Sequence, residues 1–212
     1  MLMAIKTSIE GKTTDQPQDR AVLGARLKHL RKTHGWTLAD VASRTGLAVS
    51  TVSKVERGRM TLAYDKFSRL ATGLGLDIGE LFSDQSTAFQ SGSVAVAGEG
   101  RPQPYETENY VYDMLFPELT NKKMTPMMGW LKADDVVAFS TFVSHPGEEF
   151  LMVLEGEVVV HFEGRDAVVL KPFESIYFDS ERGHLYVSSG PIPARILVVC
   201  TNLRTTSEEQ HS

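Results

Sequence analysis

The chain has 212 residues, a net charge of −5 and one cysteine. Its composition, 42% hydrophobic and 23% charged, excludes wholesale disorder and a collagen-like structure, and allows one large domain or two small ones. No apolar run approaches the roughly 18 residues that span a bilayer, and residues 1–16 lack the long apolar stretch of a secretory signal. The lone Cys200 excludes an intrachain disulfide framework and indicates a cytoplasmic protein.

Charge is divided unevenly along the chain. Residues 1–83 hold 13 Lys+Arg against 8 Asp+Glu, whereas residues 84–212 hold 9 against 19. Two domains with different functions would explain this division, and a chance distribution of surface charge is the alternative. Polar, small residues at 84–100 are typical of a linker. We therefore predict five segments: a flexible N-terminus (1–18), a first domain (19–83), a linker (84–104), a second domain (105–204) and a tail (205–212).

The first domain has the pattern of a small helical bundle. Leu23, Leu27 and Leu30 recur at helical spacing, and Gly35 fits the end of their helix. Thr37 is a good N-cap for the next helix, with an acidic residue three positions later in a variant of the capping box. The five predicted helices span residues 19–34, 38–45, 49–57, 64–73 and 78–82.

The second and third predicted helices, joined at Gly46, form a helix-turn-helix pattern. The second helix of such a pair fits the DNA major groove, and its first turn reaches the base edges. With Val52 and Val55 facing the core, the other residues of this helix point outward, and the basic residues beyond its end suit phosphates. The alternative is a helical domain that has lost DNA binding and makes protein contacts. The candidate DNA contacts are Thr37, Val49, Ser50, Thr51, Ser53, Lys54, Arg57 and Arg59.

Residues 23–82 resemble the lambda-repressor-like, xenobiotic-response-element (XRE) family, most specifically at Gly46 and at residues 53–58, SKVERG. In that family an arginine of the first helix pairs with a glutamate of the recognition helix, and Arg31 and Glu56 match these positions. The resemblance implies a five-helix domain in which this pair orients the recognition helix. Ala48 departs from the family, which often has a capping serine or threonine there.

The second domain has the texture of a β-sandwich or barrel. From residue 105 onward, short runs rich in Val, Ile, Phe and Tyr alternate with glycine-containing turns. The predicted strands span residues 111–116, 124–131, 136–144, 150–154, 157–162, 167–170, 175–178, 185–188 and 195–200.

Residues 145–156 and 170–184 resemble the two motifs of the cupin family, whose fold is a double-stranded β-helix barrel. The resemblance implies a lumen that holds a metal, a small ligand or both. Three of the four metal ligands of the family are matched, by His145, Glu149 and His184, and Val143 replaces the fourth. The second motif also departs, with Phe173 and Glu174 where glycine and aspartate are usual.

The predicted contents of the lumen remain open at this point. Two imidazoles and a carboxylate can hold a divalent metal (Zn, Fe, Mn or Ni) with open coordination positions. The alternatives are direct binding of an organic ligand and a polar network without one. Cys200, on an apolar strand, is predicted to be a buried small hydrophobe. The candidate pocket residues are Tyr110, Tyr112, Trp130, Met152 and Tyr177, followed by Met114, Phe142, Phe178 and Tyr186.

The two resemblances together imply a homodimeric XRE-type transcriptional regulator, more often a repressor than an activator, with a cupin sensor. Each subunit would contact one half-site of an inverted repeat in double-stranded DNA, with half-sites about 34 Å apart. A small-molecule effector would bias the placement of the two helical domains. One alternative is a mononuclear iron cupin enzyme resembling hydroxypropylphosphonate epoxidase, in which a lysine of the helical domain enters the active site; Gly35 stands at that position here. A second is an antitoxin-type partner-binding protein.

Overall fold

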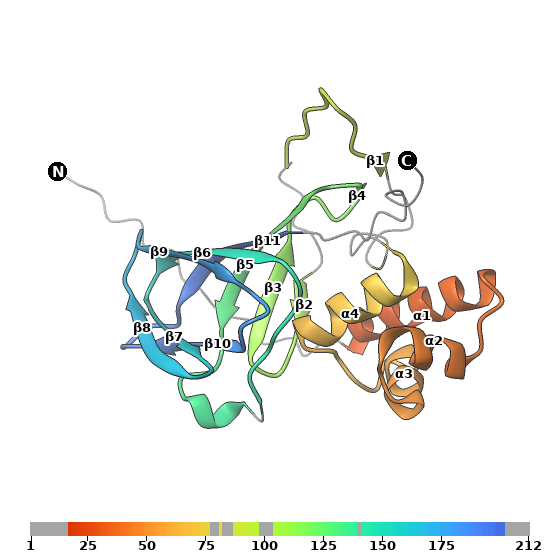
Figure 1. Cartoon of the computed structure of the whole chain (residues 1–212), viewed down its shortest axis with the longest axis horizontal. Helices are drawn as coiled ribbons and strands as arrows, with labels where there is room; N and C mark the ends of the chain where they lie inside the picture. The colour runs from red at the N-terminus through yellow and green to blue at the C-terminus, as the bar shows by residue number, and fades with distance from the viewer. Residues whose placement is uncertain (1–16, 77–80, 82–86, 98–103, 140, 202–212) are drawn as a thin grey trace, which may run out of the picture.

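The computed structural model describes residues 17–76, 81, 87–97, 104–139 and 141–201. A helical domain lies beside a β-rich barrel domain, which confirms the predicted fold class (Figure 1). Four helices lie within two residues of their predicted ends. The predicted fifth helix (78–82), except for residue 81, the tail (205–212) and most of the N-terminal segment lie outside the described residues. The four helices are α1 (Pro17–Thr33), α2 (Leu38–Thr45), α3 (Val49–Glu56) and α4 (Tyr64–Leu74).

The ends of these helices follow from local sequence signals. The Thr37 hydroxyl accepts a hydrogen bond from the Asp40 amide at 3.1 Å, and the Asp40 carboxylate accepts one from the Thr37 amide at 2.7 Å. This reciprocal capping box begins α2. Gly46 ends α2 in the left-handed region, with φ of 67°. Ala48 precedes α3 without any side-chain cap, as its methyl group requires.

The helices of this domain are in direct backbone contact. A Cβ on Gly24 of α1 would lie 2.4 Å from the carbonyl oxygen of Val55 in α3. A Cβ on Gly73 of α4 would lie 2.4 Å from the carbonyl oxygen of Arg44 in α2. Val52, Val55 and the other apolar side chains between the helices are fully buried. Since interiors this tightly packed transmit displacement, the four helices form one rigid unit.

The barrel domain is built from two antiparallel sheets. A six-stranded sheet has the order β2-β3-β5-β11-β6-β9, and a three-stranded sheet has the order β10-β7-β8. Eight of the nine predicted strands are confirmed. The strands are β2 (Pro104–Glu106), β3 (Tyr110–Met114), β5 (Met124–Leu131), β6 (Glu148–Glu155), β7 (Glu157–Phe162), β8 (Arg165–Leu170), β9 (Ser175–Asp179), β10 (His184–Ser189) and β11 (Arg195–Thr201).

The predicted strand over residues 136–144 is wrong. Val136–Ala138 instead forms a 3₁₀ helix, and the Asp135 carboxylate caps it by accepting a hydrogen bond from the Val137 amide at 3.0 Å. The Val137 side chain is 81% exposed, so its β-branched character reflects no packing in a sheet. In the described part of the segment, the one strand-like pairing is an antiparallel bridge from Val143 to His184.

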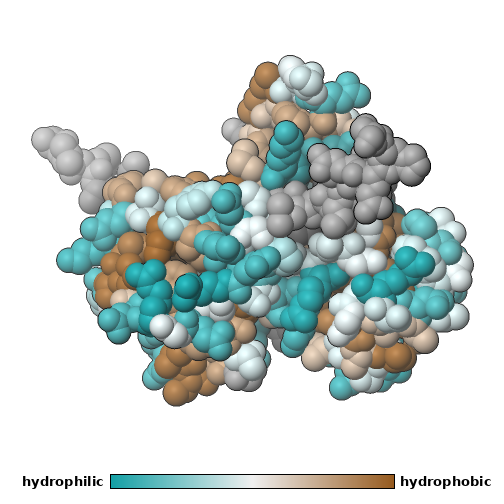
Figure 2. Space-filling view, viewed as in Figure 1, coloured by the Kyte–Doolittle hydropathy of each residue, from teal (hydrophilic) through white to brown (hydrophobic). Residues whose placement is uncertain are grey.

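An arm that includes residues 87–97 and 119–120 projects from the barrel beyond β3 (Figure 1). Its base is a parallel pairing of β1 (Thr87–Ala88) with β4 (Leu119–Thr120), so the described part of the predicted linker lies against the barrel domain. Figure 2 shows hydrophobic residues gathered on this arm. Val94 and Val96, near its tip, are the most exposed large apolar side chains among the described residues.

Tyr105 fastens the two domains together. The Tyr105 hydroxyl, from β2 of the barrel, accepts a hydrogen bond from the Leu62 amide at 2.8 Å and donates one to the Leu62 carbonyl oxygen at 2.6 Å. Its ring packs on Phe67 of α4, with ring centroids 5.3 Å apart. Tyr105, Leu62 and Phe67 are all buried. The chain segment just before α4 is therefore fastened to the barrel, and α4 is the helix that faces it (Figure 1).

Candidate DNA-binding surface and barrel cavity

The orientation of α3 depends on a buried ion pair. Glu56, at the last turn of α3, accepts hydrogen bonds from two nitrogens of the Arg31 guanidinium, at 2.6 and 3.0 Å. A third guanidinium nitrogen donates to the carbonyl oxygen of Trp36 at 2.9 Å. The hydrogen bonds that Arg31 donates to Glu56 raise the pKa of Arg31. This bidentate geometry is the strongest that a carboxylate offers, and it links α1, α3 and the turn before α2.

One face of α3 and the segment after it are open to solvent. Val49, at the first helical position, is 47% exposed, and Ser50 and Lys54 are exposed as well. Thr51 and Ser53 are half-buried. Arg57 and Arg59 are exposed beyond the helix, where the Arg57 Nε atom donates to the Ser53 carbonyl oxygen at 3.0 Å.

Thr37, the remaining candidate DNA contact, has an occupied side chain. It is exposed, but its hydroxyl donates to the Asp40 carboxylate at 2.8 Å as well as accepting from the Asp40 amide. The hydroxyl is thus used in the capping box. Only the backbone and methyl group of Thr37 are left for a DNA contact.

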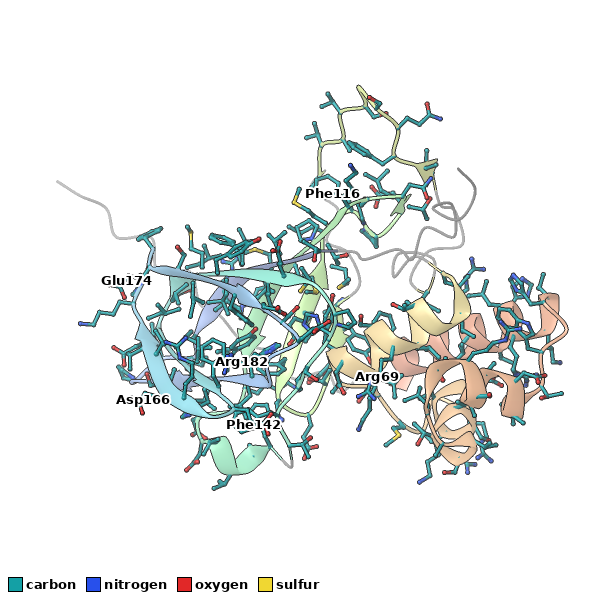
Figure 3. The ribbon with its side chains drawn as sticks, in the orientation of Figure 1. Arg69, Phe116, Phe142, Asp166, Glu174 and Arg182 are labelled. Atoms are coloured by element: carbon teal, nitrogen blue, oxygen red, sulfur yellow. The ribbon has the colours of Figure 1, made fainter. Side chains whose placement is uncertain are left out.

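A cavity of about 30 Å³ lies inside the barrel domain, where Figure 3 shows side chains of both sheets converging beside α4. This volume holds a metal ion or one or two water molecules. Most of the wall comes from β3, β5, β6, β10 and β11, and two residues come from the helical domain. The lining residues are Ala63, Tyr64, Tyr110, Tyr112, Met127, Val143, His145, Glu149, His184, Leu185, Tyr186, Val198 and Cys200.

Glu149 is the centre of the polar contacts in the cavity, and its side chain is almost completely buried. Its Oε2 atom lies 3.1 Å from His145 Nε2, 3.5 Å from Cys200 Sγ and 3.7 Å from His184 Nε2. Its Oε1 atom accepts a short hydrogen bond from the Tyr186 hydroxyl. Glu149 shares the inward face of β6 with Leu151 and Val153, because successive side chains of a strand point to opposite faces. This position explains why a carboxylate reaches the interior.

The surroundings keep Glu149 ionised. Burial by itself would raise the pKa of Glu149, but its hydrogen bonds with His145 and Tyr186 and the neighbouring imidazoles outweigh burial, so the pKa lies below its ordinary value. Burial also lowers the pKa of His184 and raises the pKa of Cys200, Tyr112 and Tyr186. A negative charge in an apolar lumen requires a cation or several donors.

The tautomer of His184 places two hydrogen-bond acceptors opposite each other, an arrangement suited to a cation. Its Nδ1 atom lies 2.8 Å from the carbonyl oxygen of Arg182, which can only accept, so Nδ1 bears the proton. Nε2 of the neutral ring is then an acceptor that faces the Glu149 carboxylate, a second acceptor. A hydrogen bond from a backbone carbonyl to the far nitrogen is how metal-binding histidines are held. Ligand atoms of His145, Glu149 and Cys200 also lie within 4.8 Å of one another. The donor set therefore fits a divalent metal.

Two of the five principal pocket candidates, Tyr110 and Tyr112, line the cavity. Trp130, Met152 and Tyr177 are not part of its wall, because each lies on the outward face of its strand. Met152 alternates with the inward Leu151 and Val153, and Trp130 stacks under the guanidinium of Arg195, 5.1 Å away. Tyr177 is 63% exposed, and its hydroxyl donates to Glu148 at 2.6 Å.

Three wall residues were missed or misread from the sequence. Cys200 is buried as predicted, but it lies against Glu149 instead of serving only as a hydrophobe. Tyr186 was a secondary candidate, and its place on a strand beside His184 was the available signal. Tyr64 was assigned only to the helical domain. Its ring meets the His145 ring edge to face, with centroids 5.0 Å apart, and burial and the neighbouring Cys200 raise its pKa well above the ordinary value.

Comparison with known proteins agrees with this division into two domains. Residues 22–82 match the helix-turn-helix domain family, and residues 136–200 match the cupin domain family. The chain is 24% identical over 157 residues to the HTH-type transcriptional regulator PuuR of Escherichia coli, covering 68% of this chain and 75% of PuuR. It is 31% identical over 75 residues to a Neisseria meningitidis hypothetical transcription factor, covering 35% of this chain and 71% of that protein.

A solved structure has the same fold. The crystal structure of an HTH_3 family transcriptional regulator from Vibrio cholerae aligns with a TM-score of 0.62 at 20% identity, covering 89% of this chain and 99% of that chain. A structure of hydroxypropylphosphonic acid epoxidase from S. wedmorenis aligns with a TM-score of 0.46, too low to bear on activity.

The two domains and these relatives define the class of protein. It is a helix-turn-helix protein with a C-terminal cupin domain. The chain belongs to the family of HTH-type transcriptional regulators, as the XRE resemblance implied. In the described part of the chain, no helix is both long and apolar enough to cross a membrane.

Proposed function

We propose that this regulator binds an inverted-repeat operator as a homodimer in the cytoplasm, most simply as a repressor, with α3 of each subunit in the major groove. The carrying observation is the bidentate Arg31–Glu56 pair. It supports a recognition helix that is held rigidly while its outer face remains solvated. A rigid helix loses little conformational freedom on binding, which favours specific contacts.

The chemistry of the exposed face suits DNA. Ser50 and Lys54 offer hydrogen-bond donors for base edges, and Val49 offers an apolar contact for a thymine methyl group. Arg57 and Arg59 are placed for phosphates beyond the helix. Residues 20–59 hold nine basic and two acidic residues, so the local charge favours the duplex although the whole chain is acidic.

In the barrel, we propose an effector site that includes a divalent metal. His145 and Glu149 would be two ligands, with His184 or Cys200 completing the set. Imidazole and thiolate ligands favour Zn or Fe over Mn, whereas a set of imidazoles and one carboxylate admits Zn, Fe, Mn or Ni. A metal here would neutralise Glu149 and leave open positions toward the small-molecule effector.

The alternative function, an iron-dependent enzyme, has less support. In that class the helical domain would deliver a lysine to the metal, and the described wall of this cavity contains no lysine. The helical domain contributes Ala63 and Tyr64 instead. Oxygen-dependent turnover of a hydroxyphosphonate by the iron-loaded protein would favour the enzyme over the regulator.

Selection of the full-length chain against random double-stranded DNA tests the proposal. We expect an inverted repeat whose half-sites lie about one helical turn apart. Ser50→Ala and Lys54→Ala should each weaken binding to the selected site about tenfold, the lower range for loss of a base contact. Lys171→Ala, which removes an equally exposed lysine from the barrel, is the matched control and should leave affinity unchanged. Failure to select any sequence would contradict the proposal.

A thermal-shift screen tests the effector site separately. Metabolites would be screened with and without each metal, because any ligand of the native lumen raises the melting temperature by mass action. We expect stabilisation by at least one metal that is abolished in His145→Ala. Equal stabilisation of both proteins would place metal binding elsewhere.

A further inference from the structure

The wall of the cavity is shared between the two domains. Eleven of its thirteen lining residues come from the barrel domain, and Ala63 and Tyr64 come from the start of α4. Strands linked by ladder hydrogen bonds form the barrel side of the wall. Tyr64 is the large side chain on the other side, and it moves only with the helical domain.

Tyr64 contacts two of the residues that converge on Glu149. Its ring meets the His145 ring at an interplanar angle of 73°, and it lines the same cavity wall as Cys200. Burial and the proximity of Cys200 raise the pKa of Tyr64. Its ring also lies 6.4 Å from that of Tyr112 on β3. The arrangement of His145 and Cys200 therefore decides how Tyr64 packs.

A displacement of Tyr64 reaches the DNA-binding surface through rigid contacts. Tyr64 begins α4, and α4 touches the backbone of α2 at Gly73, where even a methyl group would clash with Arg44. The helix α2 is the first helix of the helix-turn-helix unit. Because the four helices form one rigid unit, a movement of α4 carries α3 with it.

We propose that Tyr64 is a residue of the effector site and that it transmits occupancy of this site by a cation to the placement of the DNA-binding domain. This inference rests on the proposed function of the barrel cavity. A cation bound at His145, Glu149 and Cys200 holds two neighbours of Tyr64 in one arrangement. Tyr64 then packs against a fixed surface, so an occupied cavity holds the helical domain on the barrel more firmly than an empty one.

The Leu62 amide reports this docking directly. It donates to the Tyr105 hydroxyl of the barrel, and neither residue lines the cavity. The amide becomes available for hydrogen exchange when the helical domain separates from the barrel. The Val52 amide, which donates to the Ala48 carbonyl oxygen within the helical domain, is the internal control.

The experiment measures exchange of these two amides in the full-length protein with and without Zn²⁺, alongside calorimetry of Zn²⁺ binding. In the unmodified protein, we expect Zn²⁺ to slow exchange at Leu62 by about fivefold or more, the lower end of common coupling between sites. Exchange at Val52 should not change. In Tyr64→Ala, Zn²⁺ should still bind while the effect at Leu62 disappears.

Two further variants distinguish a loss of coupling between the cavity and the helical domain from a general loss of folding. Tyr64→Phe keeps the ring on His145 and loses the hydroxyl group, so it retains a reduced effect even where the alanine variant folds poorly. Tyr177→Phe removes a hydroxyl from the outer face of the barrel, away from the cavity, and should keep the full effect. An unchanged Leu62 rate in the unmodified protein with Zn²⁺ bound, or equal slowing in Tyr64→Ala, would overturn the proposal.

The experiments distinguish a failure of this proposal from a failure of the proposed function. Absence of Zn²⁺ binding would overturn this proposal together with the metal site of the proposed function. Absence of DNA binding in the selection would overturn the proposed regulator, and the exchange measurement would still decide the role of Tyr64.

Discussion

The helical domain and the barrel place charge in opposite ways. In the helical domain, the charged groups of the proposed DNA surface stay in water, and the largely buried pair of Arg31 with Glu56 is fully matched. In the barrel, Glu149 is buried with two histidines and a cysteine, and the His184 nitrogen that faces it is an acceptor. The first arrangement is complete without a ligand. The second is the one that we propose a cation completes.

This difference agrees with the net charges of the two regions. Residues 1–83 have a balance of +5 and residues 84–212 a balance of −10. The positive balance of the first region favours contact with a polyanion such as DNA, whereas the negative balance of the second disfavours it. The average of −5 therefore describes neither region.

The largest expected effect tests the matched pair of the helical domain. Glu56→Ala should lower the free energy of unfolding by about 3 kcal/mol, because it leaves the Arg31 guanidinium partly buried without its carboxylate. Urea denaturation followed by circular dichroism measures this. The control is Arg69→Ala, which breaks the pair with Asp65 on α4 at its half-exposed end (Arg69 is labelled in Figure 3) and should cost about 0.5 kcal/mol. Equal losses would contradict a special role for Glu56.

The next effect tests the unmatched charge of the barrel. Glu149→Gln keeps the shape of the side chain and removes its charge, so Zn²⁺ affinity should fall about 100-fold or more. Isothermal titration calorimetry measures the affinity. Glu148→Gln is the control on the same strand, because Glu148 points outward to Tyr177. If both variants bind Zn²⁺ like the unmodified protein, the metal does not use this site.

The two regions should also lose stability in different pH ranges. Burial lowers the pKa of His184, so below pH 6.5 the unfolded chain takes up a proton that the folded barrel refuses. The stability that depends on neutral His184 is thus present above pH 6.5 and is lost as the pH falls toward the folded pKa. In the helical domain, hydrogen bonds from Thr37 lower the pKa of Asp40, so its contribution is lost only below the ordinary aspartate value of 3.8.

Thermal melts at pH 7.5, 6.5, 5.5, 4.5 and about 3, in buffers of equal ionic strength and with chelator, measure this difference. His184→Gln should flatten the dependence between pH 6.5 and 5.5 while leaving the Asp40-dependent loss in place. A profile that is the same with and without His184 would assign the acid sensitivity to other groups.

A smaller effect concerns a turn of the barrel. Phe173, where the cupin motif usually has glycine, has φ of 68° and is 77% exposed. Phe173→Gly should raise the free energy of unfolding by about 1 kcal/mol, because the left-handed conformation strains side chains with a Cβ. Phe173→Ala removes the ring but keeps the strain, so it should give no gain. Urea denaturation compares the two variants.

Sequence signals predicted the helical domain well because they are local. The ends of α2 depend on Thr37, Asp40 and Gly46, which lie within or next to the helix that they terminate. The same is true of β5 and β7, whose predicted bounds are those observed. The strand predicted over residues 136–144 was wrong because its β-branched residues suggested a strand, whereas the Asp135 side chain caps a 3₁₀ helix there.

The cavity was only partly predictable. Strand alternation predicted that Glu149 points inward. Applied to Met152, the same alternation predicts an outward side chain, so it could have removed Met152 from the candidate pocket residues. Tyr64 could not be found in this way. Its role depends on how two domains dock, and no local pattern encodes a contact between α4 and a histidine far along the chain.

The smallest effect returns to the recognition helix. Ala48 already has the extended backbone of an N-cap, with φ of −66° and ψ of 143°, but no side-chain oxygen. Ala48→Ser would supply a side-chain acceptor for the amides of the first turn of α3, and should raise the free energy of unfolding by about 0.5 kcal/mol. The same substitution leaves the barrel unchanged, so Zn²⁺ affinity should stay constant. Ala48→Gly adds no acceptor side chain and should give a smaller gain or none. If the serine variant is no more stable, then the first-turn amides of α3 are already satisfied by solvent, and local capping does not limit the stability of the helical domain.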